Sequence, residues 1–133
     1  MELTHNRAVE EAAIAWVLRI EREAGREAVD TRGTGAAADI SSPPRLIEVK
    51  AYGRSARGQD LWLEPRQVEE ADRNPQFFIY VVENVRQGDP AGFTLRVLGG
   101  ETLRVLLQRR REQRYFTVPW SVKVYDETPS GLQ

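Results

Sequence analysis

The stretch that decides the fold runs from residue 38 to residue 50 and reads Ala-Asp-Ile-Ser-Ser-Pro-Pro-Arg-Leu-Ile-Glu-Val-Lys. It predicts two short strands on either side of Pro43-Pro44, with Asp39 on the first strand and Glu48 and Lys50 on the second. Because side chains alternate along a strand, Glu48 and Lys50 share one face. If the strands pair antiparallel about the prolines, Asp39 comes opposite Glu48 on that same face.

Lys50 is unusual because only two of the nineteen basic residues are lysines. A lysine ammonium is a compact point charge that can change its protonation state, which arginine does not do. Two opposed carboxylates repel each other unless a cation lies between them. The pattern therefore indicates a cation site, although a Glu-x-Lys pair on a strand is, on spacing alone, more often a solvated ion pair.

Composition limits the chemistry that the 133-residue chain can perform. It has no cysteine and one histidine, which excludes disulfides and thiolate zinc sites and leaves oxygen ligands for any metal. A formal charge of −1 argues against a nucleic-acid binder that works by bulk charge. We find no apolar run near the roughly 20 residues of a membrane span and no signal-peptide pattern, so we expect a cytoplasmic protein without membrane contact.

The periodicity of apolar residues predicts a single α/β (α+β) domain over residues 1–126, followed by a flexible tail over residues 127–133. Helices are expected at 6–24, 66–72 and 101–110, strands at 27–32, 38–41, 45–51, 77–85 and 93–98, and extended segments at 60–63 and 115–124. The core order is αβββαβ, with a mixed central sheet flanked by helices. We expect a wide loop at Pro43-Pro44, because a tight primed turn needs positive φ angles.

Glu10 falls inside the apolar arc of the first predicted helix. A glutamate turned toward the protein interior costs free energy unless it is paired, protonated or bound to a metal. Glu10 is therefore a candidate site residue. The arc is wide and rich in alanine, so a partly exposed Glu10 remains the alternative.

The order of elements, with Asp39 on the second strand and Glu48-Val49-Lys50 on the third, resembles the PD-(D/E)XK nuclease superfamily, whose fold is restriction-endonuclease-like. With the later stretches 63–71 and 78–85, residues 8–98 are similar to the C-terminal domain of protein NO VEIN, a domain of unknown function related to the Mrr-like nucleases. Ala71 stands where the RecB-like nucleases carry a tyrosine, which argues against that subgroup.

The resemblance implies a catalytic site around one Mg²⁺ or Mn²⁺ ion. Asp39 and Glu48 would be its carboxylate ligands and the backbone carbonyl of Val49 a third oxygen ligand. Lys50 would orient or deprotonate the attacking water, so that hydrolysis needs no histidine. Two further catalytic candidates are Glu10, from the first helix, and Gln67, from the second.

Three residues near this site are candidates for nucleic-acid contact. Arg54 and Arg57 lie in a glycine-containing loop, and Trp62 follows it. Arginines can contact phosphates and an exposed indole can stack on a base, although solvent exposure is the commoner fate of such residues.

The sequence leaves three functions open. The first is a Mg²⁺-dependent nuclease that hydrolyses phosphodiester bonds of DNA. The second is a non-catalytic module that recognises nucleic acid or protein in a larger defence or repair assembly. The third is a scaffold that forms a homodimer through residues 77–85, which requires that this strand lie at a sheet edge.

Overall fold

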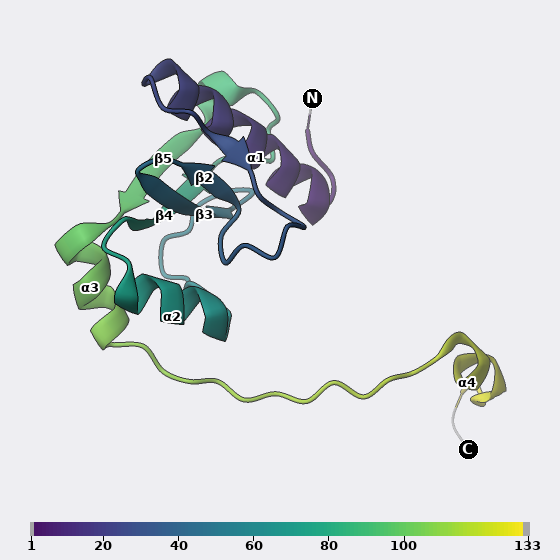
Figure 1. The fold of residues 1–133 in the computed structure, drawn as a ribbon. Coiled ribbons are helices and arrows are strands. Elements are labelled where there is room, and N and C mark those ends of the chain that lie inside the picture. Colours follow the sequence, from purple (N-terminus) through teal and green to yellow (C-terminus); the bar gives the residue numbers. More distant parts are fainter. Residues whose placement is uncertain (1, 132–133) are drawn as a thin grey trace.

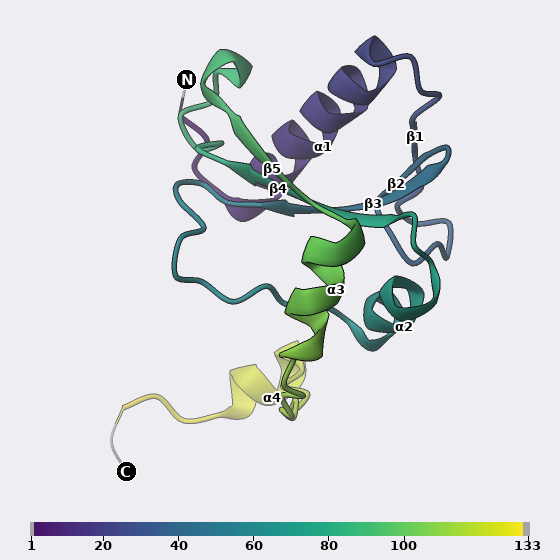
Figure 2. The same cartoon turned by 90° about the vertical axis from the view of Figure 1, so that its left-hand side faces the viewer.

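A five-stranded mixed sheet forms the centre of the protein, with helices on both faces (Figures 1 and 2). The computed structural model describes residues 2–131. Its elements are α1 (Asn6–Glu23), β1 (Val29–Asp30), β2 (Ile40–Ser42), β3 (Arg45–Ala51), α2 (Pro65–Arg73), β4 (Phe77–Glu83), a 3-10 turn η1 (Pro90–Gly92), β5 (Thr94–Leu98), α3 (Gly100–Gln108) and α4 (Val122–Glu127). The predicted α+β class and the order αβββαβ are confirmed.

The strands lie in the sheet in the order in which they occur along the chain. The pairs β1–β2, β2–β3 and β4–β5 are antiparallel, whereas β3 and β4 are parallel and are connected through α2. The edges are therefore β1 and β5. Because β4 lies between β3 and β5, the hypothesis that residues 77–85 form an edge strand for dimerisation is wrong.

Two apolar clusters hold the helices to the sheet. On one face, α1 packs against alternate residues of the strands, including Ile47, Val49 and Tyr80. On the opposite face, Leu103 and Leu107 of α3 pack on Phe77, Ile79 and Val81 of β4, with Ala71 of α2 beside them. The alternation predicted for β3 is confirmed, so Glu48 and Lys50 share the face on the side of α2 and α3.

The connection between β2 and β3 is shorter than expected. The strands stay paired up to Ser42 and Arg45, which leaves only Pro43 and Pro44 in the turn. The peptide bond between them is cis, the arrangement found in type VI turns, which do not need positive φ angles. The expectation of a wide loop is wrong, whereas the register of the two strands is the predicted one.

Two further predictions differ from the structure. The first strand is limited to Val29–Asp30, whereas residues 60–63 form neither a helix nor a strand. The predicted extended segment 115–124 runs only to Ser121, which caps a short helix, α4, by accepting a hydrogen bond from Val124 N. The first helix begins at Asn6, as predicted, and is capped by His5. Of the predicted tail, residues 132–133 lie outside the described residues.

Glu21 is a buried polar hub that joins α1 to the sheet. Its carboxylate accepts two hydrogen bonds from Arg26, at 2.6 and 2.8 Å, one from Ser42 Oγ at 3.0 Å and one from the Tyr80 hydroxyl at 2.9 Å. Burial alone would raise the pKa of Glu21, but the hydrogen bonds from Arg26, Tyr80 and Ser42 outweigh it, and the pKa lies below its ordinary value.

None of the helices in residues 2–131 is long and apolar enough to cross a bilayer.

We predict that Glu21→Ala destabilises the protein by about 2–4 kcal/mol at pH 7, because it leaves Ser42 and Tyr80 buried without their acceptor. Glu23→Ala, two residues along the same helix at a 67% exposed side chain, should change the free energy of unfolding by less than about 0.5 kcal/mol. Urea unfolding measures both. Because the folded-state pKa of Glu21 is lowered, the cost of Glu21→Ala should shrink as the pH falls below 4.5; a constant cost would contradict the role of the charge.

Candidate functional site

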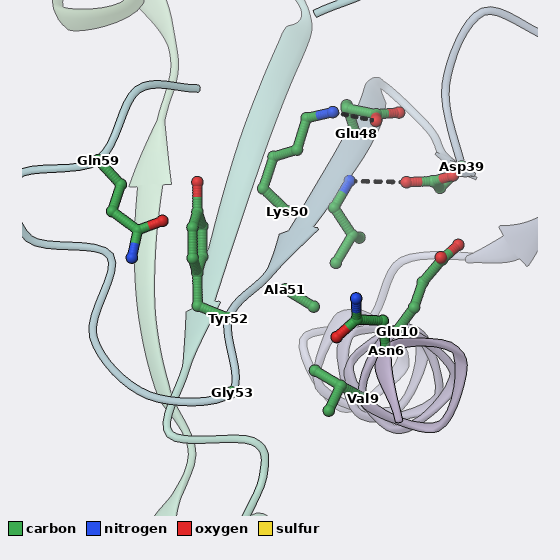
Figure 3. A pocket seen from close by; sticks show the side chains of 11 residues that line it. Asn6, Val9, Glu10, Asp39, Glu48, Lys50, Ala51, Tyr52, Gly53 and Gln59 are labelled. Carbon is green, nitrogen blue, oxygen red and sulfur yellow. Dashed lines mark hydrogen bonds and ion pairs between the residues drawn. The ribbon is translucent and has the colours of Figure 1, made fainter. Parts of the chain in front are cut away.

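The β2–β3 hairpin brings Asp39 and Glu48 together. Ile40 pairs with Ile47 at the end of the ladder, and the next two residues in that register are Asp39 and Glu48, as predicted. Asp39 lies just before β2 and not within it, and its Oδ2 accepts a hydrogen bond from Val49 N at 2.9 Å. The backbone of β3 thus fixes the Asp39 carboxylate beside Glu48 (Figure 3).

Glu48 is a buried carboxylate whose hydrogen-bonding capacity is only half used. Its side chain is 6% exposed, and Oε2 lies 3.1 Å from Lys50 Nζ. Oε1 is buried and has no hydrogen-bond partner in the described part of the chain. Burial and the nearby charge of Asp39 raise the pKa of Glu48 to about 7, although the Lys50 ammonium acts in the opposite direction.

Lys50 stands two residues along β3 from Glu48, on the same face of the strand. Its side chain is 22% exposed, so the ammonium reaches solvent while it contacts the buried carboxylate. The structure therefore places Asp39, Glu48 and Lys50 in one cluster, as the sequence predicts. Tyr52 continues the same face, and Figure 3 shows its ring beside Lys50.

Glu10 does not point into the core, so the expectation of an interior glutamate is wrong. Its side chain is 54% exposed, and the nearest cation is Arg32, with Nη1 at 3.8 Å. The helix arc buries Val9 and Ala13 instead, which leaves Glu10 at its rim. Figure 3 shows the Glu10 carboxylate reaching from α1 toward Asp39. Of the acidic residues on this helix, Glu21 is the buried one.

Two surface hollows meet at the acidic residues. The larger, of about 580 Å³, is lined among others by Lys50, Tyr52 and Gln59. The smaller, of about 320 Å³, is lined among others by Arg66 and Gln67. Both are also lined by the same three carboxylates: Glu10, Asp39 and Glu48. These acids therefore lie where a ligand could extend in either direction.

Gln67 reaches the smaller hollow, but it also has a structural task. Its Oε1 accepts a hydrogen bond from Glu64 N at 3.0 Å and closes a capping box at the start of α2. The sequence pattern Glu64-Pro-Arg-Gln67, with an acceptor at each end, could have indicated this cap. Gln67 is thus fixed at a position where it lines the smaller hollow together with the acidic residues.

Arg54, Arg57 and Trp62 are exposed, but none of them lines either hollow. Their loop is held by the buried carboxylate of Glu83, which accepts hydrogen bonds from Ala56 N at 2.8 Å and Arg96 Nε at 2.8 Å. Sequence reasoning missed Glu83. The loop therefore borders the site without contributing these three side chains to its walls.

Comparison with known families places the site within one domain. The family model described as "Protein NO VEIN, C-terminal" matches residues 9–95. The chain belongs to this family. Asp39, Glu48, Lys50 and Gln67 all lie within the matched NO VEIN C-terminal domain, as does Glu10, whereas α3 and α4 follow it. No curated protein and no solved structure matches the chain.

The NO VEIN C-terminal domain offers few side-chain ligands for a metal. Among residues 2–131, no group of three or more acidic or histidine side chains is arranged to hold an ion. Mg²⁺, however, usually keeps several waters and binds through one or two carboxylates. The buried, unpartnered Oε1 of Glu48 beside Asp39 fits that mode. Val49 lines the larger hollow and would add a backbone oxygen.

We predict that Glu48→Gln stabilises the metal-free protein in a pH-dependent way. The folded-state pKa of Glu48 is raised from 4.5 to about 7, so the folded state binds more protons across this range and loses stability as the pH rises through it. At about 1.4 kcal/mol for each pH unit, the gain from Glu48→Gln reaches at most about 3 kcal/mol above pH 7 and vanishes near pH 4.5.

Thermal unfolding in EDTA across pH 4.5–8 measures this effect. Glu69→Gln, at an exposed position of α2, serves as the control and should follow the wild type. A Glu48→Gln variant that is less stable than the wild type at pH 8 would show that the Glu48–Lys50 pair stabilises the fold, and that burial of the Glu48 charge does not oppose folding.

Proposed function

We propose that this domain is a Mg²⁺- or Mn²⁺-dependent nuclease that hydrolyses phosphodiester bonds of DNA in the cytoplasm. The observation that carries the proposal is the buried Glu48 carboxylate, which has one oxygen on Lys50 and one without a partner. In a purely structural ion pair, a buried oxygen without a hydrogen-bond partner would only cost stability. In a binding site, the same oxygen is available to a ligand.

The proposal includes a restriction-endonuclease-like core of the Mrr-like type. Its support is the order αβββαβ, with the acidic hairpin β2–β3 in the middle and α2 crossing over to β4. The family match over residues 9–95 covers these elements except for the first three residues of α1.

Each side chain of the cluster has its own role in the proposed hydrolysis. Asp39 and Glu48 would hold the divalent ion, with the carbonyl of Val49 as a further oxygen. When bound, the ion supplies positive charge that activates water and offsets the charge that develops on the phosphate. Lys50 reaches solvent beside Glu48; its ammonium orients the attacking water by hydrogen bonding and stabilises the same developing charge.

Two further residues would support this set. Glu10 is exposed at the meeting point of the two hollows and can accept a hydrogen bond from a water that the ion retains. Gln67 is held by its capping box and lines the smaller hollow. We assign both to positioning water or substrate.

DNA would enter along the two hollows and lie against the loop that borders the larger one. Arg54 and Arg57 are exposed there and would contact backbone phosphates. Trp62, with 64% of its surface exposed, would stack on a base.

The first test is cleavage of supercoiled plasmid and of linear DNA in Mg²⁺ or Mn²⁺. We expect Glu48→Ala and Lys50→Ala each to lower the rate roughly a hundredfold or more, because each removes a group that acts on the reacting atoms. The unfolding temperature of Glu48→Ala should stay close to wild type or rise, since it removes a buried charge, whereas that of Lys50→Ala should fall, because the buried Glu48 carboxylate loses its cationic partner.

The chain supplies a close control for Lys50. Lys123, the second lysine, lies on α4 outside the matched domain, so Lys123→Ala should cleave at the wild-type rate. Glu101→Ala, at an exposed position of α3, is the matching control for Glu48. Wild-type cleavage by Glu48→Ala or Lys50→Ala would refute the assignment.

A second function, a non-catalytic module that recognises nucleic acid or protein in a larger assembly, is favoured by one observation. The described residues hold no group of three acidic or histidine ligands, and a domain that had lost its chemistry could keep the remaining two carboxylates.

Calorimetric titration with Mn²⁺ separates the two functions. The nuclease requires that the wild type bind the ion and that Glu48→Ala bind it at least about tenfold more weakly, as expected when one direct ligand is lost. Equal and weak binding by both proteins, with intact folding, would favour the non-catalytic module.

A further inference from the structure

The C-terminal arm, which we define as residues 115–127, exposes an unusual amount of apolar surface. Eleven large apolar side chains are exposed in residues 2–131, and seven of them lie in this arm: Tyr115, Phe116, Val118, Trp120, Val122, Val124 and Tyr125. Phe116 is the most exposed, at 88%. Soluble monomers rarely gather apolar side chains in this way without a partner to cover them.

Part of the arm has local structure of its own. Ser121 caps α4, the rings of Trp120 and Tyr125 lie 5.1 Å apart, and Trp120 Nε1 donates to Thr128 Oγ1 at 3.4 Å. These contacts fix the arrangement of several apolar groups although none of them packs on the core. The arm therefore presents a defined surface.

The base of the arm is anchored so that the arm leads away from the sheet. Arg110 pairs with Asp72 of α2 at 3.0 Å, and Arg111 pairs with Asp60 at 3.4 Å. Both views show the chain leaving α3 and carrying α4 away from β5 (Figures 1 and 2). The arm thus lies away from the edge strand of its own chain.

That edge strand is itself incomplete. β5 pairs with β4 alone, so the main-chain groups along its outer side have no strand partner within residues 2–131. Val97 of β5 and Leu106 of α3 are also exposed, at 44% and 43%. An unpaired edge with apolar neighbours is a template for a further strand.

Residues 115–118 of the arm and the edge strand β5 are of similar length, and both are rich in residues that favour strands. Residues 115–118 form a short extended run of apolar and β-favouring residues that ends at Pro119, which cannot donate to a ladder. β5 has five residues, Thr94–Leu98. We propose that two copies of this chain form a dimer in which residues 115–118 of each copy add a sixth strand to β5 of the other.

A second copy is the occupant because the strand and its acceptor edge occur in the same chain while the anchored arm points away from its own edge. Reciprocal exchange about a two-fold axis satisfies both edges at once and closes the assembly. It also brings α4 and its apolar side chains against the partner. The inference does not depend on the proposed nuclease activity.

Cross-linking between two different single variants tests the exchange directly, because the natural chain contains no cysteine. Mixed Val97→Cys and Thr117→Cys proteins should give a cross-linked heterodimer with a short bismaleimide. Mixed Trp62→Cys and Thr117→Cys proteins should not, because Trp62 is exposed but lies outside both the arm and β5. Equal cross-linking in both mixtures would overturn the proposal.

Light scattering and sedimentation equilibrium give the second readout. The wild type should be a dimer, and the double variant Phe116→Ser/Val118→Ser should raise the dimer dissociation constant by roughly tenfold or more. Its circular dichroism should be unchanged, since these side chains do not contact the core. Trp62→Ser is the matched control and should leave the dimer intact. A monomeric wild type, or a dimer that survives the double variant, would refute the proposal.

Discussion

The register between β2 and β3 is the constraint on which the site depends. Ser42 pairs with Arg45, so the turn holds two residues and every later pair is fixed. A slip of one residue would exchange the two faces of a strand. Glu48 would then face the apolar cluster under α1, and Val49 would leave it. The hydrogen bond from Val49 N to Asp39 Oδ2 continues this register one step beyond the last ladder pair.

Three buried carboxylates differ in their hydrogen bonding and in the direction in which their pKa is shifted. Glu21 is saturated with hydrogen bonds from three side chains, and its pKa is lowered. Glu83 is likewise held by Ala56 and Arg96, with a lowered pKa. Glu48 alone among the three has a raised pKa and an oxygen without a partner. Its burial therefore opposes folding, which sets Glu48 apart from the two carboxylates whose hydrogen bonds stabilise the fold.

The sequence predicts the parts of this arrangement that depend on local periodicity. Alternation along β3 places Glu48 and Lys50 on one face, and the symmetry of the hairpin places Asp39 opposite. Prediction from the sequence fails where the burial of a side chain is decided by packing against another helix or strand. Glu10 and Glu21 lie on the same helix, and only packing against Ser42 and Tyr80 decides which of them is buried. The cis peptide at Pro43-Pro44 and the exposed arm are equally invisible to periodicity, because both depend on the context in which a segment is placed.

The packed core extends beyond the residues that the family model matches, because α3 covers one face of the sheet. The match ends at residue 95, inside β5. Leu103 and Leu107 of α3 nevertheless cover Phe77 and Ile79 of the interior strand β4. Without α3, that face of the sheet, which also carries Glu48 and Lys50, would be open to water. The burial that raises the pKa of Glu48 thus depends on a sheet that is covered in part by α3, which lies after the matched residues. The site is a property of residues 6–108 together, and the arm begins only after that unit is complete.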